Sequence, residues 1–258
     1  MTLPMFLVPD VDARPLEVTG PEARHAVTVK RLGVGEALQL TDGRGGLVTG
    51  TIAEAGKDRM RIDVLSSTLV PAATPQVTVV QALPKSDRSE LAVDLATQAG
   101  ADRIVPWQAH RCVARWQGAK VAKGQRKWSD AALAAAKQSR RPWVPEVEPL
   151  ASTADVEDLI RRTVAEGGVA AVLHEAEDRE FASVGWSAAP AVVFIVGPEG
   201  GVSEEELDRF LAAGAVTVKL GPQVLRTASA AMVALSALGA LTGRWSAAPE
   251  STSHPQPR

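Results

Sequence analysis

The sequence predicts an α/β protein with a small N-terminal β-barrel and a larger C-terminal domain built on a parallel sheet. Short, turn-separated β segments fill residues 1–72, whereas strand and helix patterns alternate over residues 76–245. Glycine-rich turns follow two of the later strands. With 258 residues, 45% of them hydrophobic, the chain is long enough for two modest domains with their own cores.

The first 72 residues carry four short β-patterned segments. A glycine-rich stretch, TDGRGG at 41–46, is typical of a hairpin loop between two of them. Because short antiparallel strands must protect their edges, these segments predict a closed barrel. The four segments are 6–8, 37–40, 47–52 and 60–64. A proline-containing stretch at 71–75 predicts a linker to the second domain.

From residue 77 onward, apolar strand-like runs alternate with helical segments. Such alternation indicates a parallel sheet with helices on its faces. The predicted strands are 77–83, 103–107, 169–173, 192–196 and 216–220. The predicted helices are 89–99, 126–139, 153–165, 203–213 and 228–241. Residues 246–258 hold prolines and serines and few large apolar groups, which predicts a disordered tail.

The glycine-rich turn after the strand at 192–196 is the most informative stretch. Three glycines, Gly197, Gly200 and Gly201, allow a ligand to approach the backbone closely. A helix follows, with a capping box formed by Ser203 and Glu206. Such a loop lies at the carboxyl end of a strand, where open α/β sheets bind ligands. A plain strand-to-helix turn is the alternative for one loop of this kind.

A second turn repeats the arrangement about twenty residues later. The strand at 216–220 runs into Gly221 and Pro222, and a further helical segment begins near Arg226 and Thr227. Two such turns close together in the sequence favour a paired ligand site. Their spacing matches neither the dinucleotide nor the triphosphate glycine motif.

Charge is unevenly distributed along the chain. The net charge of −2 gives no global argument for nucleic-acid binding, but residues 110–141 hold nine Lys or Arg against one Asp. Four of the six tryptophans lie in or beside this segment. Basic groups neutralise phosphates and planar groups stack on unpaired bases. A nucleic-acid surface is one interpretation. A solvated basic face with tryptophans in the core is the other.

Several classes of function are disfavoured by what the sequence lacks. A single cysteine, Cys112, rules out an internal disulfide and suits a reducing compartment. No membrane span or secretory signal is visible, so we expect a cytoplasmic protein. The four histidines lack zinc-site spacing and no nucleophile elbow occurs, so we expect no metal. Methyl transfer from S-adenosylmethionine fits, because the sulfonium carries its own activation and the protein mainly aligns the reactants.

Several motifs together resemble the RsmE family of 16S rRNA uridine-N3 methyltransferases, in the SPOUT superfamily. The motifs are Leu173-His174-Glu175, the GPEGG run at 197–201, and LGPQVLRT at 220–227. The similarity extends along the chain to Gln138-Ser139 with Arg141 and Pro145, Leu83-Pro84-Lys85, Ile104-Val105-Pro106, and His25 with Lys30-Arg31-Leu32.

This resemblance implies a PUA-like N-terminal domain over 1–72 and a SPOUT domain over 76–245 with a deep C-terminal trefoil knot. It implies a homodimer that uses S-adenosyl-L-methionine to methylate N3 of a specific uridine in 16S rRNA of the small ribosomal subunit. The cofactor-binding positions that it implies are Leu173, His174, Glu175, Gly197, Pro198, Glu199, Gly200, Gly201, Leu220, Gly221, Val224, Leu225 and Thr227.

Arg226 is the candidate catalytic residue. It follows the ligand loop directly, and a cation there would stabilise the anion that forms as uridine N3 loses its proton. A structural cap or ion pair is the alternative role. Candidate RNA-binding residues are His25, Lys30, Arg31, Lys85, Arg88, Arg111, Gln138 and Arg141. Ala228 and Lys137 stand where the family often has glutamate.

Three other functions remain open from the sequence. A SPOUT methyltransferase acting on another RNA, such as tRNA, would carry the same barrel and basic segment. A non-catalytic RNA-binding ribosome-assembly factor would fit the missing glutamate at Ala228. An enzyme that acts on a small molecule with a nucleotide cofactor would need no basic segment.

Overall fold

The computed structural model describes residues 3–85, 88–175 and 179–246. The chain forms two compact units. Unit 1 comprises the described residues up to Ala72 together with Ala136–Val144, and unit 2 comprises Ala73–Ala135 and Pro145–Ser246. The tail predicted to be disordered lies, beyond Ser246, outside the described residues.

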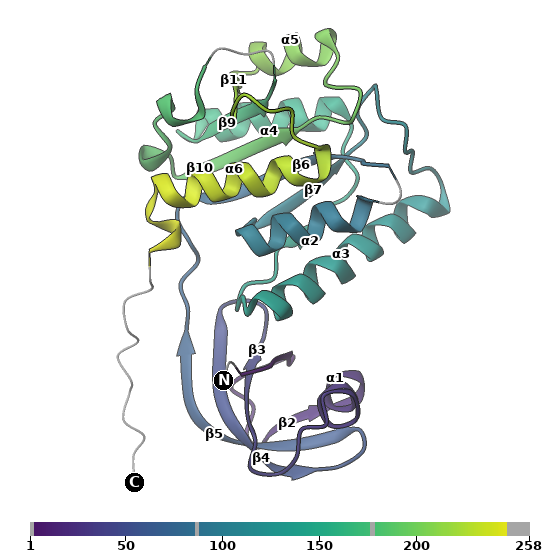
Figure 1. The fold of residues 1–258 in the computed structure, drawn as a ribbon, viewed down its shortest axis with the longest axis vertical. Coiled ribbons are helices and arrows are strands. Elements are labelled where there is room, and N and C mark those ends of the chain that lie inside the picture. Colours follow the sequence, from purple (N-terminus) through teal and green to yellow (C-terminus); the bar gives the residue numbers. More distant parts are fainter. Residues whose placement is uncertain (1–2, 86–87, 176–178, 247–258) are drawn as a thin grey trace. The chain divides into compact units, whose positions relative to one another are not determined.

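Unit 1 contains a five-stranded mixed sheet in the order β1-β3-β4-β5-β2 (Figure 1). Its strands are β1 Met5–Leu7, β2 Leu16–Thr19, β3 Ala37–Thr41, β4 Gly46–Ala55 and β5 Arg59–Leu69. β1 pairs with β3 in parallel, and the other neighbours are antiparallel. Alternate residues of β3 and β4 are buried, as expected where one face of a sheet covers a core. A short helix, α1 Gly20–Arg24, and a π-helical turn, His25–Val29, connect β2 to β3.

Residues 136–144 belong to unit 1 although the sequence assigns them to the second domain. The indole Nε1 of Trp143 donates to the carbonyl of Val70 at 2.9 Å, and the backbone N–H of Gly45 donates to Pro142 at 3.0 Å. Lys137 Nζ lies 2.6 Å from Glu22 Oε1. Unit 1 is therefore assembled from two separate stretches of chain.

Unit 2 is built on a six-stranded sheet in the order β11-β9-β10-β6-β7-β8, with every pair parallel. Its strands are β6 Gln76–Ala82, β7 Arg103–Trp107, β8 Glu146–Val147, β9 Val169–Leu173, β10 Ala191–Val196 and β11 Val216–Val218. Its helices are α2 Ser89–Ala99, α3 Ala119–Ser139, α4 Thr153–Ala165, α5 Glu204–Ala212 and α6 Thr227–Leu241, the end of α3 lying in unit 1. Figure 1 shows α2 and α6 in front of this sheet and α4 behind it.

The core of unit 2 lies on both faces of the central strands. β6 and β10 are buried over almost their whole length, which explains their continuous apolar sequences. Trp107 and Phe210 contact edge-to-face, with ring centroids 5.3 Å apart. Phe181 stacks on Trp186 at 4.6 Å. Both pairs fill the space between the sheet and its flanking segments. The trefoil knot stays a prediction.

The strand register aligns the ends of three strands. Leu173, the last residue of β9, pairs with Val196 of β10 and with Val218 of β11. The loops that leave these strands therefore begin at one edge of the sheet, where ligands of open α/β sheets bind. Within the described residues, no helix is both long and apolar enough to cross a membrane.

Candidate ligand pocket at the strand ends

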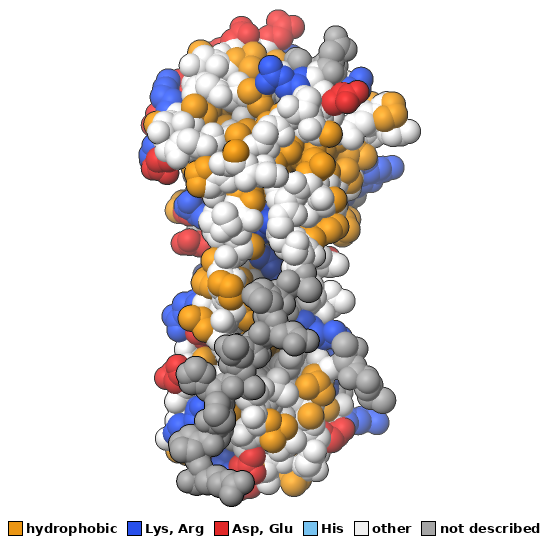
Figure 2. All heavy atoms as spheres, turned by 90° about the vertical axis from the view of Figure 1, so that its left-hand side faces the viewer, with side chains coloured by type: hydrophobic (Ala, Val, Ile, Leu, Met, Phe, Trp, Pro, Cys, Tyr) orange, Lys and Arg blue, Asp and Glu red, His pale blue; other side chains and the backbone are white. Residues whose placement is uncertain are grey.

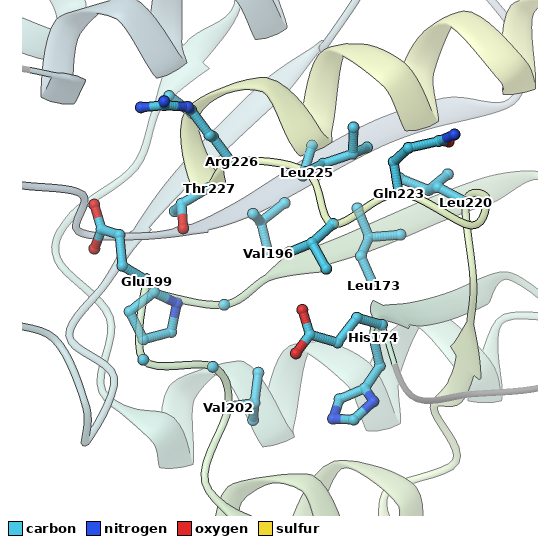
Figure 3. Close-up of a pocket in the computed structure, with 18 of the residues that line it drawn as sticks. Leu173, His174, Val196, Glu199, Val202, Leu220, Gln223, Leu225, Arg226 and Thr227 are labelled. Atoms are coloured by element: carbon cyan, nitrogen blue, oxygen red, sulfur yellow. The ribbon is translucent and has the colours of Figure 1, made fainter.

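A cavity of about 830 Å³ lies where β9, β10 and β11 end (Figure 3). Three loops enclose it, and they follow Leu173, Val196 and Val218. The volume is within the range of about 300–1,000 Å³ that is usual for small-molecule sites. We call this cavity the strand-end pocket.

The glycine-rich loop after β10 presents bare backbone to the strand-end pocket. A Cβ atom on Gly197 would lie 2.9 Å from Val202 Cγ2 and 3.2 Å from the Val202 amide nitrogen, so only glycine fits there. Gly201 has φ +73°, and its N–H donates to the carbonyl of Pro198 at 2.9 Å. The turn thus needs glycine for close approach at one position and for a left-handed backbone at another.

Two segments from elsewhere in unit 2 fasten this loop. The guanidinium Nη1 of Arg111 donates to the carbonyls of Gly200 at 3.2 Å and Val202 at 3.4 Å. The backbone N–H of Lys85 donates to Glu199 Oε1 at 3.0 Å. The loop is therefore held from the segments that follow β6 and β7.

Glu206, one turn into α5, makes a third connection. This carboxylate is only 4% exposed and accepts hydrogen bonds from the His110 N–H at 2.8 Å and from Thr153 Oγ1 at 2.9 Å. Its other oxygen completes a capping box with Ser203. Desolvation acts to raise the pKa of Glu206, but the hydrogen bonds from His110, Ser203 and Thr153 outweigh it and hold the pKa below its ordinary value. The group is an ionised clamp between α5 and the chain after β7.

The pocket has apolar walls and a polar end. Leu173, Val196 and Leu225 come together at its centre, while Glu199, Arg226 and Thr227 lie toward one end (Figure 3). Arg226 directly precedes α6, and its carbonyl accepts from the Ser229 N–H at 2.9 Å. Its side chain is exposed at the pocket rim.

The structure brings the residues of the two predicted loops together. All thirteen positions expected to bind the cofactor line the strand-end pocket, and so does Arg226. Three predicted RNA-binding residues, Lys85, Arg88 and Arg111, line it as well. The other five belong to unit 1 and are His25, Lys30, Arg31, Gln138 and Arg141. Lining residues that were not among the predicted binding or catalytic residues are Val196, Val202, Val218, Lys219, Gln223, Ala228 and Ala230.

Two further positions from the sequence analysis, Ala228 and Cys112, are buried. Ala228 is buried and brings no carboxylate to the pocket. Cys112 is buried, and desolvation raises the pKa of its thiol, which makes the thiolate scarce. Among the described residues, no group of three or more His, Cys, Asp or Glu could hold a metal ion.

The tryptophans of the basic segment pack inward. Trp107 and Trp128 are fully buried, and Trp116 contacts Trp128 edge-to-face at 5.2 Å. Trp143 is half-buried, with its Nε1 bonded to the backbone. The interpretation of Trp107 and Trp128 as stacking platforms for bases is therefore wrong, because both rings are fully buried. A stacking role for the half-buried Trp116 and Trp143 stays a prediction.

Comparison with known proteins agrees with this architecture. Residues 72–239 match a family model described as an RNA methyltransferase domain, and residues 18–65 match an RNA methyltransferase PUA domain. The fold and the matches together define an RNA methyltransferase of the two-domain type. More narrowly, the chain belongs to the ribosomal RNA small subunit methyltransferase E family. It is 49% identical over 230 residues to the Mycobacterium tuberculosis protein of that name, covering 89% of this chain and 88% of that protein.

More distant relatives show the same likeness. The Bacillus subtilis ribosomal RNA small subunit methyltransferase E is 29% identical over 235 residues, covering 88% of this chain and 90% of that protein. The Neisseria gonorrhoeae enzyme of the same name, solved bound to S-adenosyl methionine, superposes with a TM-score of 0.82 at 25% identity, over 93% of this chain and 98% of that one. A Legionella pneumophila protein solved with bound cofactor SAM gives 0.81 at 28% identity, over 94% and 99%.

Proposed function

We propose that this protein methylates N3 of a specific uridine in 16S rRNA of the small ribosomal subunit, with S-adenosyl-L-methionine as the methyl donor. The observation that carries the proposal is the glycine-lined pocket at the ends of three parallel strands, in a chain of this family. The two relatives solved with S-adenosyl methionine support the choice of cofactor.

The lining of the strand-end pocket suits this cofactor. Half-buried leucines, Leu173, Leu220 and Leu225, offer apolar surface to flat rings. Gly197 and Gly221 leave backbone N–H and C=O groups uncovered for the polar edge of a base. The carboxylate of Glu175 is exposed on the lining, where it offsets positive charge on a ligand. When bound, the cofactor supplies a methyl group on a positively charged sulfur, so the protein needs mainly to align the reactants.

Arg226 is the residue to which we assign the electrostatic role. Uridine N3 must lose its proton before or during attack, and the negative charge then spreads onto the neighbouring oxygens. A guanidinium at the pocket rim stabilises that charge, and the N-terminus of α6 adds to the positive potential.

Replacing Arg226 tests the assignment. We expect Arg226→Ala to lower the single-turnover methylation rate by about 100-fold, the usual effect of removing one such charge-stabilising group. Cofactor affinity, measured by calorimetry, should change little because the side chain lies at the rim. Arg226→Lys should recover part of the rate. Full activity in Arg226→Ala would remove the residue from the chemistry.

The reaction itself is tested with labelled S-adenosylmethionine and small ribosomal subunits from a strain that lacks this enzyme. Nucleoside mass spectrometry should find the label in 3-methyluridine of 16S rRNA. Label on tRNA instead would support the assigned cofactor but show that the RNA substrate is tRNA. No label on any RNA, with measurable cofactor binding, would favour an assembly factor or a small-molecule enzyme. With such a substrate, we expect the protein to work in the cytoplasm.

A homodimer is the assembly that we propose. An apolar groove beside the strand-end pocket is lined by Phe181, Pro222, Ala237 and Leu241, among others. Leu241 and Trp245 are 44% and 55% exposed. Figure 2 shows hydrophobic side chains gathered on one face of unit 2. A second copy covering such a surface would bury it, because large exposed apolar patches mark interaction sites. Sedimentation at micromolar concentration should give twice the chain mass, whereas a monomer would contradict the proposal.

A further inference from the structure

A stretch of unit 2 carries positive charge with no acidic residue among it. Between residues 111 and 129 there are six Lys or Arg and no Asp or Glu, in a chain whose net charge is −2. All six side chains belong to exposed residues. They are Arg111, Arg115, Lys120, Lys123, Arg126 and Lys127.

Helix α3 gathers four of these cations on one side. Residues three and four apart in a helix lie on the same face, which groups Lys120, Lys123 and Lys127 and sets Arg126 beside them. We call these four residues the α3 basic face. The opposite side of α3 packs inward, where Trp128 and Ala132 are fully buried. Lys127 pairs with Glu90 at 3.2 Å.

Hydrogen bonds connect the α3 basic face to the strand-end pocket by two routes. Trp128 Nε1 donates to Ser89 Oγ at 2.8 Å, which fixes the middle of α3 to the start of α2, directly after the pocket residue Arg88. On the second route, Arg115 Nη2 donates to the carbonyl of His110 at 3.1 Å, next to the pocket residue Arg111. The cations therefore continue from the pocket rim onto α3.

Another surface helix of the same unit shows the contrast. In α4, Arg161 pairs with Glu157 and Asp158, so this cation is neutralised within the helix. Among the described residues, one of the four cations of the α3 basic face, Lys127, pairs with a carboxylate, and that carboxylate lies on α2. Clustered like charges repel one another unless an anion covers them, and a row of phosphates is the anion that matches a row of cations.

We propose that the α3 basic face holds the phosphate backbone of the RNA substrate beside the target nucleotide. This inference rests on the proposed function. Phosphate contacts position a nucleic acid without reading its sequence. The one aromatic side chain of α3, Trp128, is fully buried, and the four residues of the α3 basic face are all cations, so this face contributes register and affinity, not base recognition.

The test is a triple variant of the full-length protein, Lys120→Gln with Lys123→Gln and Arg126→Gln. Lys127 is left intact because it pairs with Glu90. Binding to unmethylated small ribosomal subunits is measured across a range of KCl concentrations. Each lost phosphate contact lowers the salt slope by about 0.7 for a single strand, so we expect a decrease of about 2 and weaker binding at every salt concentration. S-adenosylmethionine affinity should stay within twofold, which also shows that unit 2 is folded.

Two controls separate this role from a general charge effect. Arg162→Gln removes one exposed cation from α4 and should leave the salt slope unchanged. Lys120→Arg with Lys123→Arg keeps the charge and should bind as the parent does. A triple variant with the parental slope and affinity would overturn the inference, while methylation by the parent would still uphold the proposed function. If the parent neither binds nor methylates small subunits, both fail.

Discussion

At the scale of single residues, the strand-end pocket depends on one buried carboxylate. Glu206 accepts hydrogen bonds from His110, Thr153 and Ser203, and each donor belongs to a different part of unit 2 or to the cap of α5 itself. The sequence identified Glu206 only as a helix cap. Its contact with His110 joins residues 96 apart, and no local pattern records such a distance.

We expect Glu206→Gln to destabilise the protein by about 3 kcal/mol. An amide offers one acceptor oxygen where the carboxylate offers two, so two buried hydrogen bonds are lost. The NH₂ group of the glutamine would also face N–H or O–H donors, with which it cannot form hydrogen bonds as a donor. Chemical denaturation at neutral pH measures the loss. Glu205→Gln, an exposed neighbour in the same turn of α5, is the matched control and should change stability by less than about 0.5 kcal/mol.

The lowered pKa of Glu206 also predicts how the free energy of unfolding depends on pH. Because folding lowers the pKa of Glu206, its contribution is fully present above its ordinary value of 4.5 and is lost as pH falls through the folded-state pKa. The parent protein should therefore lose stability on acidification below that value more steeply than Glu206→Gln. Parallel stability–pH curves for the two proteins would show that the clamp does not titrate as described.

Arg140 is strained at the end of α3. Its φ of 57° lies in the left-handed region, and the N–H of Arg141 donates to the carbonyl of Ala136 at 2.8 Å across the turn. Glycine normally occupies this position. We expect Arg140→Gly to stabilise the protein by about 0.5–1 kcal/mol, since the side-chain clash is larger than the entropy cost of glycine. Arg140→Ala keeps the strain and should give no gain in thermal midpoint.

At the scale of elements, the loop between β10 and α5 sets the shape of the pocket. Gly197→Ala would force a methyl group to within 2.9 Å of Val202 Cγ2 and 3.2 Å of a backbone nitrogen, so the loop must move. We expect cofactor affinity to fall at least about tenfold, equivalent to about 1.4 kcal/mol. Gly185→Ala is the control, because nothing lies within 4 Å of its Cβ position. Calorimetric titration distinguishes them, and equal affinities would place the loop outside the site.

Elements with a strong local pattern followed from the sequence. The predicted bounds of the helices at 89–99 and 153–165 agree with α2 and α4, and β7 and β9 also agree. β2 and β8 were missed because a four-residue and a two-residue strand hold too few apolar positions to show a period. α3 begins seven residues before the predicted start at 126. Its first turns are polar and contain Gly124, whose missing side chain makes room for the ring of Trp116.

The candidate site was predictable only in part for a related reason. The glycine-rich loops can be recognised from short stretches of sequence. They come together because the carboxyl ends of neighbouring parallel strands lie at the same edge of the sheet. The hydrogen bonds from Arg111 to Gly200 and Val202 span about ninety residues of sequence, and only the fold reveals them.

At the scale of the whole molecule, Arg244 ties together distant parts of unit 2. It lies in the 3₁₀ turn Gly243–Trp245, which follows α6. Its Nη1 lies 3.0 Å from Asp102 Oδ2, and its Nη2 donates to the carbonyl of Gly100 at 2.6 Å. It also donates to the carbonyl of Pro75. With side-chain exposures of 5% and 14%, Arg244 and Asp102 form a pair that water reaches poorly.

We expect Arg244→Ala to cost about 3–5 kcal/mol, because it leaves the carboxylate of Asp102 buried without its cation. The double variant with Asp102→Asn should recover part of the loss by removing the stranded charge. Denaturant unfolding measures both. Arg162→Ala, an exposed arginine of the same unit, should change stability by less than about 0.5 kcal/mol.

The interleaving of the two units sets an order for folding during synthesis. Most of unit 1 leaves the ribosome first, but its sheet lacks the contacts of Trp143 and Pro142 until residues 136–144 have also emerged. Unit 2 in turn lacks the contacts of Arg244 with Pro75, just before β6, and with Asp102 until the end of α6 and the turn after it have emerged. A nascent chain stalled between these points would hold an incomplete first unit, open to chaperones and proteases, which makes the middle of translation its most vulnerable stage.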